Sequence, residues 1–241
     1  MQHLSWDWIG NHLRVKVLYS YAGIATQILV NDIKNNSSIL MDVGDGTLRD
    51  LLDLPKRVYE NIQLILITHG HFDHIGGLYS LLAFFRMINR KEKLTILCPK
   101  EVIEFQGIIN TFLSCYSNSI PYQLDVKEID SQFIFDSLTI IPFPVKHSGS
   151  IIGKKVLPSI PAFGYVLQLN EEKVVFTGDT GFFKELENII SNADFALIEG
   201  TNKEKKTDYH LSIDEAKNLG KLAKNYRVIH KIIPEIAKRN A

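Results

Sequence analysis

The sequence predicts an α/β fold in which two β-sheets carry helices on their outer faces. Short apolar runs rich in β-branched residues alternate with segments that repeat at helical spacing along most of the chain. The first strands follow one another with no helix between them, and the second half of the chain shows the same order. Two sheets explain this repeat better than one doubly wound sheet. At 241 residues the chain has the size of one domain, so we assign residues 1–241 to a single domain.

Each predicted strand is an apolar run that turn-forming residues bound on both sides. In chain order these runs cover residues 14–21, 26–30, 38–43, 64–67, 94–98, 124–129, 133–135, 138–145, 163–169, 173–176, 195–198 and 227–229. The runs 163–169 and 173–176 are close enough in the chain to form a hairpin.

The predicted helices begin and end at recognisable signals. They cover residues 47–54, 78–89, 101–113, 183–191 and 213–224. Pro55 ends the first of them, and Ser212 with Glu215 forms a capping box that starts the last. We expect one helical turn or more after Pro234, and residues 148–161 to be the longest irregular stretch.

Composition excludes several classes of protein. Lys+Arg and Asp+Glu number 27 each, so the charge balance does not indicate a nucleic-acid binder. The two cysteines, Cys98 and Cys115, have neither metal-type nor redox-type spacing. No secretory signal and no membrane-spanning run are present, so we expect a cytoplasmic protein with reduced thiols.

The densest chemical motif lies at residues 68–78, between an apolar strand and a helix. His69, His71, Asp73 and His74 stand within six residues of one another there. Imidazole nitrogens together with a carboxylate oxygen are donors that suit a borderline divalent metal such as zinc. We therefore predict a metal site at this turn.

Four later residues lie at the ends of predicted elements. His147, Asp179 and His230 follow strands, and His210 precedes the capped helix. Strand ends on one edge of a sheet are where dispersed residues meet, although each of these residues alone would be unremarkable. If two metals are held together, a bridging carboxylate offsets their repulsion. We assign that role to Asp179, because Gly178 and Gly181 leave room for close approach.

These motifs resemble those of the metallo-β-lactamase superfamily. The match consists of the HxHxDH motif at residues 69–74, the lone His147, the Thr-Gly-Asp-Thr segment around Asp179, and His230. The resemblance implies a four-layer αββα sandwich of two mixed sheets. It also implies a dinuclear metal site, usually zinc, with manganese or iron as alternatives.

Within the superfamily the chain is most similar to the ribonuclease Z and phosphodiesterase branch. The resemblance implies that one metal is held by His69, His71 and His147, and the other by Asp73, His74 and His230. Asp179 would bridge the two metals, and Asp42 would orient a ligand histidine. His210 would protonate the leaving group, which makes it catalytic together with Asp73 and Asp179.

Two departures from ribonuclease Z bear on the substrate. Only 32 residues separate His147 from Asp179, which leaves no room for the long arm that grips tRNA. The residues after the last ligand also differ from a phosphate-gripping sequence, and Lys154 and Lys155 lie in too short a loop to replace the arm. We therefore predict a phosphodiesterase acting on a small or oligomeric substrate, with nucleic acid and a homodimer left open.

Other functions remain as alternatives. A lactonase or thioester hydrolase would need an acyl pocket, which Ile151, Ile152, Val156 and Leu157 could line. A tRNA 3′-processing endonuclease is a second alternative. A metal-dependent oxygenase or an inactive binding protein is a third, against which the complete set of metal-type residues argues.

Overall fold

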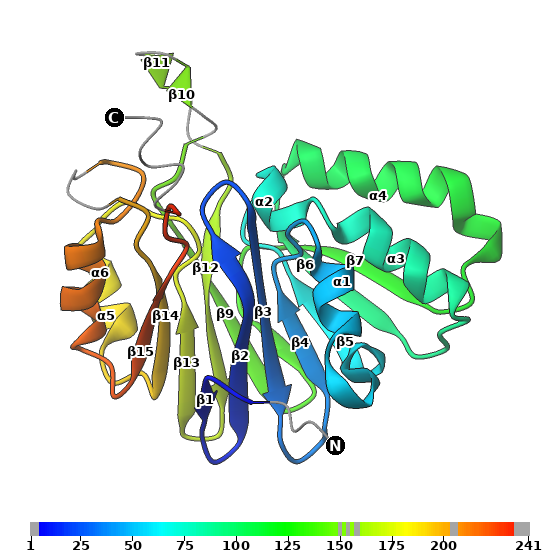
Figure 1. Cartoon of the computed structure of the whole chain (residues 1–241), viewed down its shortest axis with the longest axis horizontal. Helices are drawn as coiled ribbons and strands as arrows, with labels where there is room; N and C mark the ends of the chain where they lie inside the picture. Colours follow the sequence, from blue (N-terminus) through cyan, green and yellow to red (C-terminus); the bar gives the residue numbers. More distant parts are fainter. Residues whose placement is uncertain (1–4, 149–150, 153–154, 157–159, 203–206, 234–241) are drawn as a thin grey trace. The chain divides into compact units, whose positions relative to one another are not determined.

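The computed structural model describes residues 5–148, 151–152, 155–156, 160–202 and 207–233, which divide into two compact units (Figure 1). The first unit takes in residues up to 129 except 20–23, and the second takes in residues 20–23 and those from 130 onward. Our assignment of the whole chain to one domain stays a prediction.

The first unit contains a mixed sheet of seven strands among the described residues. In sheet order they are β1 (Trp8–Ile9), β2 (Leu13–Tyr21), β3 (Ala25–Asp32), β4 (Ser38–Met41), β5 (Ile62–Leu66), β6 (Leu94–Pro99) and β7 (Leu124–Ile129). β3 and β4 are antiparallel, whereas β4, β5, β6 and β7 are parallel. The antiparallel start and the alternation with helices agree with the sequence prediction.

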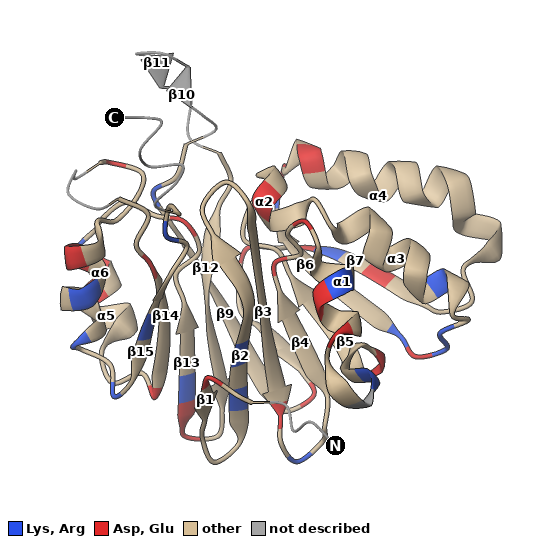
Figure 2. Cartoon of the chain, in the orientation of Figure 1, with Lys and Arg blue, Asp and Glu red and all other residues tan. Residues whose placement is uncertain are grey.

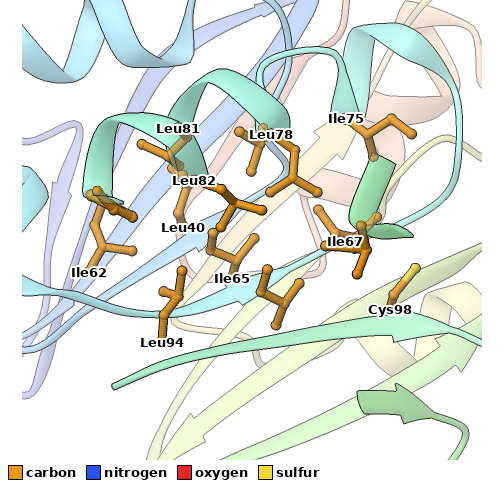
Figure 3. Close-up of a cluster of buried hydrophobic side chains, with 14 of the residues drawn as sticks. Leu40, Ile62, Ile65, Ile67, Ile75, Leu78, Leu81, Leu82, Leu94 and Cys98 are labelled. Atoms are coloured by element: carbon orange, nitrogen blue, oxygen red, sulfur yellow. The ribbon is translucent and has the colours of Figure 1, made fainter. Parts of the chain in front are cut away.

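Helices cover one face of this sheet. They are α1 (Thr47–Leu52), α2 (Phe72–Ile75), α3 (Leu78–Met87) and α4 (Ile103–Tyr116), with 3₁₀ turns η1 (Pro55–Asn61) and η2 (Ser117–Ser119). Figure 3 shows Leu40 and Ile65 of the sheet facing Leu78 and Leu82 of the helical layer. The short helix α2 and the 3₁₀ turns carry too few residues to show a period, so the sequence did not predict them. Among the described residues, no helix is long and apolar enough to span a membrane.

The second unit contains a mixed sheet of six strands among the described residues. In sheet order they are β15 (Tyr226–Ile229), β14 (Phe195–Glu199), β13 (Glu172–Phe176), β12 (Phe163–Leu169), β9 (Leu138–Pro144) and β8 (Phe133–Phe135). β13, β14 and β15 are parallel, and the remaining neighbours are antiparallel.

Helices α5 (Glu185–Ile190) and α6 (Ile213–Gly220) pack on one face of the second sheet. The predicted capping box is present, with Glu215 N donating to Ser212 Oγ at 3.2 Å and Ser212 N donating to Glu215 Oε2 at 3.0 Å. α6 is shorter than predicted because the chain tightens after Gly220: Leu222 N donates to the carbonyl of Leu219 at 3.0 Å, and Ala223 N donates to that of Gly220 at 3.1 Å. Both sheets with their helices confirm the predicted α/β class of two mixed sheets flanked by helices.

The prediction of an irregular stretch at residues 148–161 is partly wrong. Two strands, β10 (Ile151–Ile152) and β11 (Lys155–Val156), pair antiparallel there. Their backbone groups satisfy one another, which sequence periodicity cannot reveal over two residues each. Several predicted features lie outside the described residues, namely Lys154, Leu157, the side chains of Ile151, Ile152, Lys155 and Val156, and the helical turn after Pro234.

Candidate metal centre

The turn after β5 presents four metal-type side chains in the first unit. The chain leaves the sheet through Ile67 and Thr68 and enters α2, whose first turn is closed by the carbonyl of His71 accepting from His74 N at 2.9 Å. Because the turn is so tight, His69, Asp73 and His74 are buried, whereas His71 is half-buried. The strand–turn–helix setting is the one the sequence predicted.

Distances within this turn suit a metal ion. His69 Nε2 lies 3.1 Å from His71 Nδ1, and His74 Nε2 lies 3.8 Å from Asp73 Oδ2. Two nitrogens that bind one tetrahedral zinc ion at about 2.0–2.1 Å stand roughly 3.4 Å apart. The two histidine nitrogens therefore already have the spacing of two ligands of one metal.

A buried acid orients these histidines. Asp42, with a left-handed backbone (φ 59°), accepts from His74 Nδ1 at 2.7 Å and from Thr68 N at 2.8 Å. Thr68 Oγ1 donates to Asp42 at 2.9 Å and lies 2.9 Å from His69 Nδ1, from which it can accept. This network assigns the protons to the two Nδ1 atoms and leaves the lone pairs on Nε2, where a metal would bind.

Burial of Asp42 has an electrostatic consequence. Burial raises the pKa of the Asp42 carboxyl above its ordinary value, while the charge of His74 and the hydrogen bonds from His74 and Thr68 act against that rise. The predicted contact between Asp42 and a ligand histidine is present, and the sequence prediction missed the part played by Thr68. A threonine directly before the HxH motif was the available signal.

The second unit gathers the other predicted residues at one edge of its sheet. β13 and β15 run parallel to each other, and β9 runs in the same direction, so the residues after these strands meet at one edge. Asp179 Oδ2 lies 3.9 Å from His147 Nε2, and Asp179 Oδ1 lies 3.3 Å from His230 Nδ1. All three side chains are buried. Each oxygen of Asp179 thus faces a different histidine, and its role as a bridging carboxylate stays a prediction.

The two glycines around Asp179 meet different structural requirements. A Cβ on Gly181 would collide with the carbonyl oxygen of Asp208, and Gly178 has a left-handed backbone (φ 59°). Gly181 therefore makes room for the segment that carries His210. The predicted close approach is present at Gly181, where the approaching group is the backbone of Asp208.

Glu199 organises the second unit's side of the site, and the sequence prediction missed it. This fully buried carboxylate accepts from His210 Nδ1 at 2.9 Å and from Thr180 N at 2.8 Å through Oε1. Its Oε2 accepts from Thr201 N at 3.0 Å and from Thr201 Oγ1 at 2.8 Å. The acid holds the Nδ1 proton of His210, so Nε2 is left to exchange a proton with a substrate. Its position at the end of an apolar strand could have drawn attention to it.

His230 is held in an uncommon backbone conformation. Its φ is 53°, which costs a residue with a side chain roughly 1–2 kcal/mol. The conformation is maintained by His230 N donating to Ser20 Oγ at 3.0 Å. Thr201 Oγ1, whose proton goes to Glu199, lies 2.9 Å from His230 Nδ1, from which it can accept. Ala22 N also donates to the carbonyl of Lys231 at 3.1 Å. The tip of the β2–β3 hairpin, residues 20–23, therefore positions a residue about 210 places later in the chain.

Candidate ligand atoms within the second unit lie close enough to share an ion. One atom from each of His147, Asp179 and His210 lies within 4.8 Å of the other two. The same holds for Glu199, His210 and His230. The hydrogen bond from His210 Nδ1 to Glu199 is the kind of contact that also orients a metal-ligating histidine, so this geometry fits either a ligand or a proton donor.

Comparison with known proteins agrees with these motifs. The family model described as the β-lactamase superfamily domain matches residues 38–230. A ribonuclease Z of Thermococcus sibiricus is 27% identical, and the match covers 77% of this chain and 73% of that protein. A ribonuclease Z of Pyrococcus furiosus is 28% identical with similar coverage, 77% and 73%.

Solved structures share the fold across both units. The short form of human tRNase Z matches with a TM-score of 0.72 at 20% identity, covering 92% of this chain and 93% of that one. A diphosphatase of the PhnP family matches with a TM-score of 0.70 at 16% identity, covering 95% and 91%. The metallo-β-lactamase fold protein YhfI from Bacillus subtilis gives a TM-score of 0.72 at 16% identity, covering 93% and 88%.

Proposed function

The chain belongs to the β-lactamase superfamily, and we propose that it is a metal-dependent hydrolase that cleaves a phosphodiester. The observation that carries the proposal is the pairing of His210 with the buried Glu199, on the same sheet edge as Asp179. The thiolate that leaves a thioester needs less help than the alkoxide that leaves a phosphodiester, so a dedicated proton donor favours the phosphodiester over the thioester. The names of the relatives, ribonuclease Z among them, point the same way.

Two divalent metal ions are part of the proposal. His69, His71 and His147 would hold one ion, Asp73, His74 and His230 would hold the other, and Asp179 would bridge them. The 3.1 Å spacing of the first two histidine nitrogens and the two-sided contacts of Asp179 support this assignment. We propose zinc, with manganese and iron as alternatives, because imidazole and carboxylate donors suit all three. When bound, such ions supply Lewis acidity: they lower the pKa of water and neutralise negative charge on phosphate oxygens.

The protein's own residues would perform the remaining chemistry. His210, with its Nδ1 proton held by Glu199, would give the Nε2 proton to the departing oxygen. Asp42 and Thr68 would keep His69 and His74 oriented while charge develops. Asp73 and Asp179 would act as catalytic carboxylates, because their negative charges would offset the positive charges of the two metal ions at the reacting centre.

The alternatives stay distinct from this proposal. A tRNA 3′-processing endonuclease is the second candidate, because several relatives carry the name ribonuclease Z. The balance of 27 basic and 27 acidic residues favours a smaller substrate. A lactonase or thioester hydrolase is the third candidate. A cytoplasmic location and a homodimer, both expected from the sequence, stay proposals.

A substrate panel would test the function. Chelated protein would receive zinc or manganese and then bis(p-nitrophenyl) phosphate, a precursor tRNA, a lactone or a thioester. We expect turnover of the small phosphodiester and about two metals per chain by elemental analysis. Turnover of the lactone or thioester alone would refute the phosphodiesterase, and exclusive cleavage of the tRNA would favour the endonuclease.

Variants would test the metal assignment. His74→Ala and His147→Ala should each abolish turnover and lower the metal content, because each removes a proposed ligand of a different ion. His12→Ala, a half-buried histidine outside the motifs, is the matched control and should retain both properties. Normal metal content in both ligand variants would contradict the dinuclear assignment.

A further inference from the structure

The start of α4 lies against the turn that carries His69 and His71. A Cβ on Gly70 would stand 2.5 Å from Glu104 Oε2 and 2.8 Å from Val102 Cγ1. Figure 1 shows α2 beside the first turn of α4, in agreement with this contact. Since consecutive Cα atoms are about 3.8 Å apart, the Glu104 carboxylate lies within roughly 8 Å of the Cα atoms of both histidines.

Two large apolar side chains are exposed on the two segments that approach each other at Gly70. Phe72, between His71 and Asp73, is 64% exposed, and Ile103 is 76% exposed. Neither packs into the hydrophobic cluster of the first unit. The backbone of Phe72 is nevertheless fixed, because its carbonyl accepts from Gly76 N at 2.7 Å. A ring that is left in water on a fixed stretch of backbone within the metal motif is available to a ligand.

The negative charge of Glu104, at the start of α4, is of the wrong sign to bind phosphate. Glu104 is exposed and has no hydrogen-bond or ion-pair partner in the part of the chain that the structure describes. Figure 2 shows an acidic residue in the first turn of α4. A carboxylate repels the oxygens of a phosphodiester, so it suits a neutral part of the substrate that offers N–H donors.

We propose that Phe72, Ile103 and Glu104 form a subsite for the nucleobase of a nucleoside phosphodiester. Phe72 and Ile103 contact the face of the base, and Glu104 accepts N–H groups from its edge. Guanine fits best, since it presents a ring N–H beside an amino group, whereas thymine presents a single N–H. The proposal rests on the phosphodiesterase function proposed above and names the class of substrate.

Three esters would separate the parts of the proposal. They are the 5′-(p-nitrophenyl phosphate) esters of guanosine and of thymidine, and methyl p-nitrophenyl phosphate, which has no base. Phe72→Ala should raise KM for both nucleoside esters by about 5- to 150-fold, the usual effect of losing one stacked base, and leave the methyl ester unchanged. Met87→Ala is the matched control, because Met87 is 69% exposed on α3 and lies outside the subsite.

The Glu104→Gln variant tests the edge contact. The wild type should prefer guanosine to thymidine in kcat/KM, and the variant should lose about 10-fold or more of that preference, since hydrogen bonds to a charged group are the stronger ones. Equal effects of Phe72→Ala on all three esters, or an unchanged preference in Glu104→Gln, would overturn the subsite.

Measuring nucleotide binding directly separates the nucleobase subsite from the proposed phosphodiesterase function. If none of the three esters turns over, the phosphodiesterase function fails while the subsite can still be measured by calorimetry with guanosine 5′-monophosphate. Weaker binding in both Phe72→Ala and Glu104→Gln, but not in Met87→Ala, would support the subsite. Equal affinity in all four proteins would refute it.

Discussion

Replacing Glu199 by glutamine should slow the proton transfer without removing the metals. The substitution keeps the shape of a side chain that is fully buried and accepts four hydrogen bonds. It removes the negative charge that faces His210 Nδ1 at 2.9 Å. The glutamine amide either keeps a weaker hydrogen bond to His210 or turns its own N–H groups toward the imidazole, which must then take the other tautomer.

The size of the effect follows from that one contact. A hydrogen bond to a charged group contributes about 1.5–3 kcal/mol, which corresponds to roughly 10- to 150-fold in rate if it acts in the transition state. The complete loss of general acid catalysis would cost about 10²–10⁴-fold. We therefore expect kcat to fall by about 10- to 150-fold in the Glu199→Gln variant, and by more in His210→Ala.

Two phosphodiesters with different leaving groups provide the assay. An alkoxide needs a proton as it departs, whereas p-nitrophenolate needs little help, so the variant should be slow on an alkyl ester and close to normal on bis(p-nitrophenyl) phosphate. Metal content should stay near two per chain. Glu172→Gln, which alters another buried glutamate of the same sheet, is the control. An equal loss on both substrates, or a loss of metal, would refute the reasoning.

Three further predictions concern the residues that hold the site. Asp42→Asn should weaken metal binding by about 10- to 100-fold, measured by competition with a chelator, and unchanged affinity would argue against its orienting role. Ser20→Ala should weaken metal binding by a similar factor, because it releases the backbone of His230, whereas Ser20→Thr keeps the hydroxyl and should keep the wild-type metal affinity. If Ser20→Ala instead lowers the melting temperature of the metal-free protein and leaves its metal affinity normal, Ser20 has a purely structural role. Gly181→Ala should lower both kcat and the melting temperature. Gly107→Ala, where a Cβ meets nothing within 4 Å, is the control and should raise the melting temperature slightly. A Gly181→Ala protein with unchanged kcat and melting temperature would contradict the close packing.

The strands and the main helices could be predicted because each depends on local pattern. Apolar runs of three or more residues revealed the strands, and the capping box at Ser212 revealed the start of α6. The helix α2 and the strands β1, β10 and β11 were not predicted, because they span two to four residues each and depend on pairing and turns. The length of each apolar run or helical repeat therefore decided which elements could be predicted from the sequence.

The candidate ligands could be predicted for a different reason. His69, His71, Asp73 and His74 are concentrated in one turn, so spacing alone reveals them. The residues that orient them are dispersed: Ser20 supports a histidine about 210 positions away. A serine such as Ser20 has no pattern that separates it from an ordinary surface residue, and Glu199 has only its place at the end of an apolar strand.

The sequence by itself determined the chemistry of this protein: the metal-type donors, their order along the chain and the strand ends that carry them. Only the tertiary structure decided how those donors are held. The buried acids Asp42 and Glu199 direct the protons of the histidines next to them, because a carboxylate removed from water must satisfy its oxygens with nearby N–H and O–H groups. That requirement acts through space between residues far apart in the chain, so it becomes visible only once the fold has brought them together.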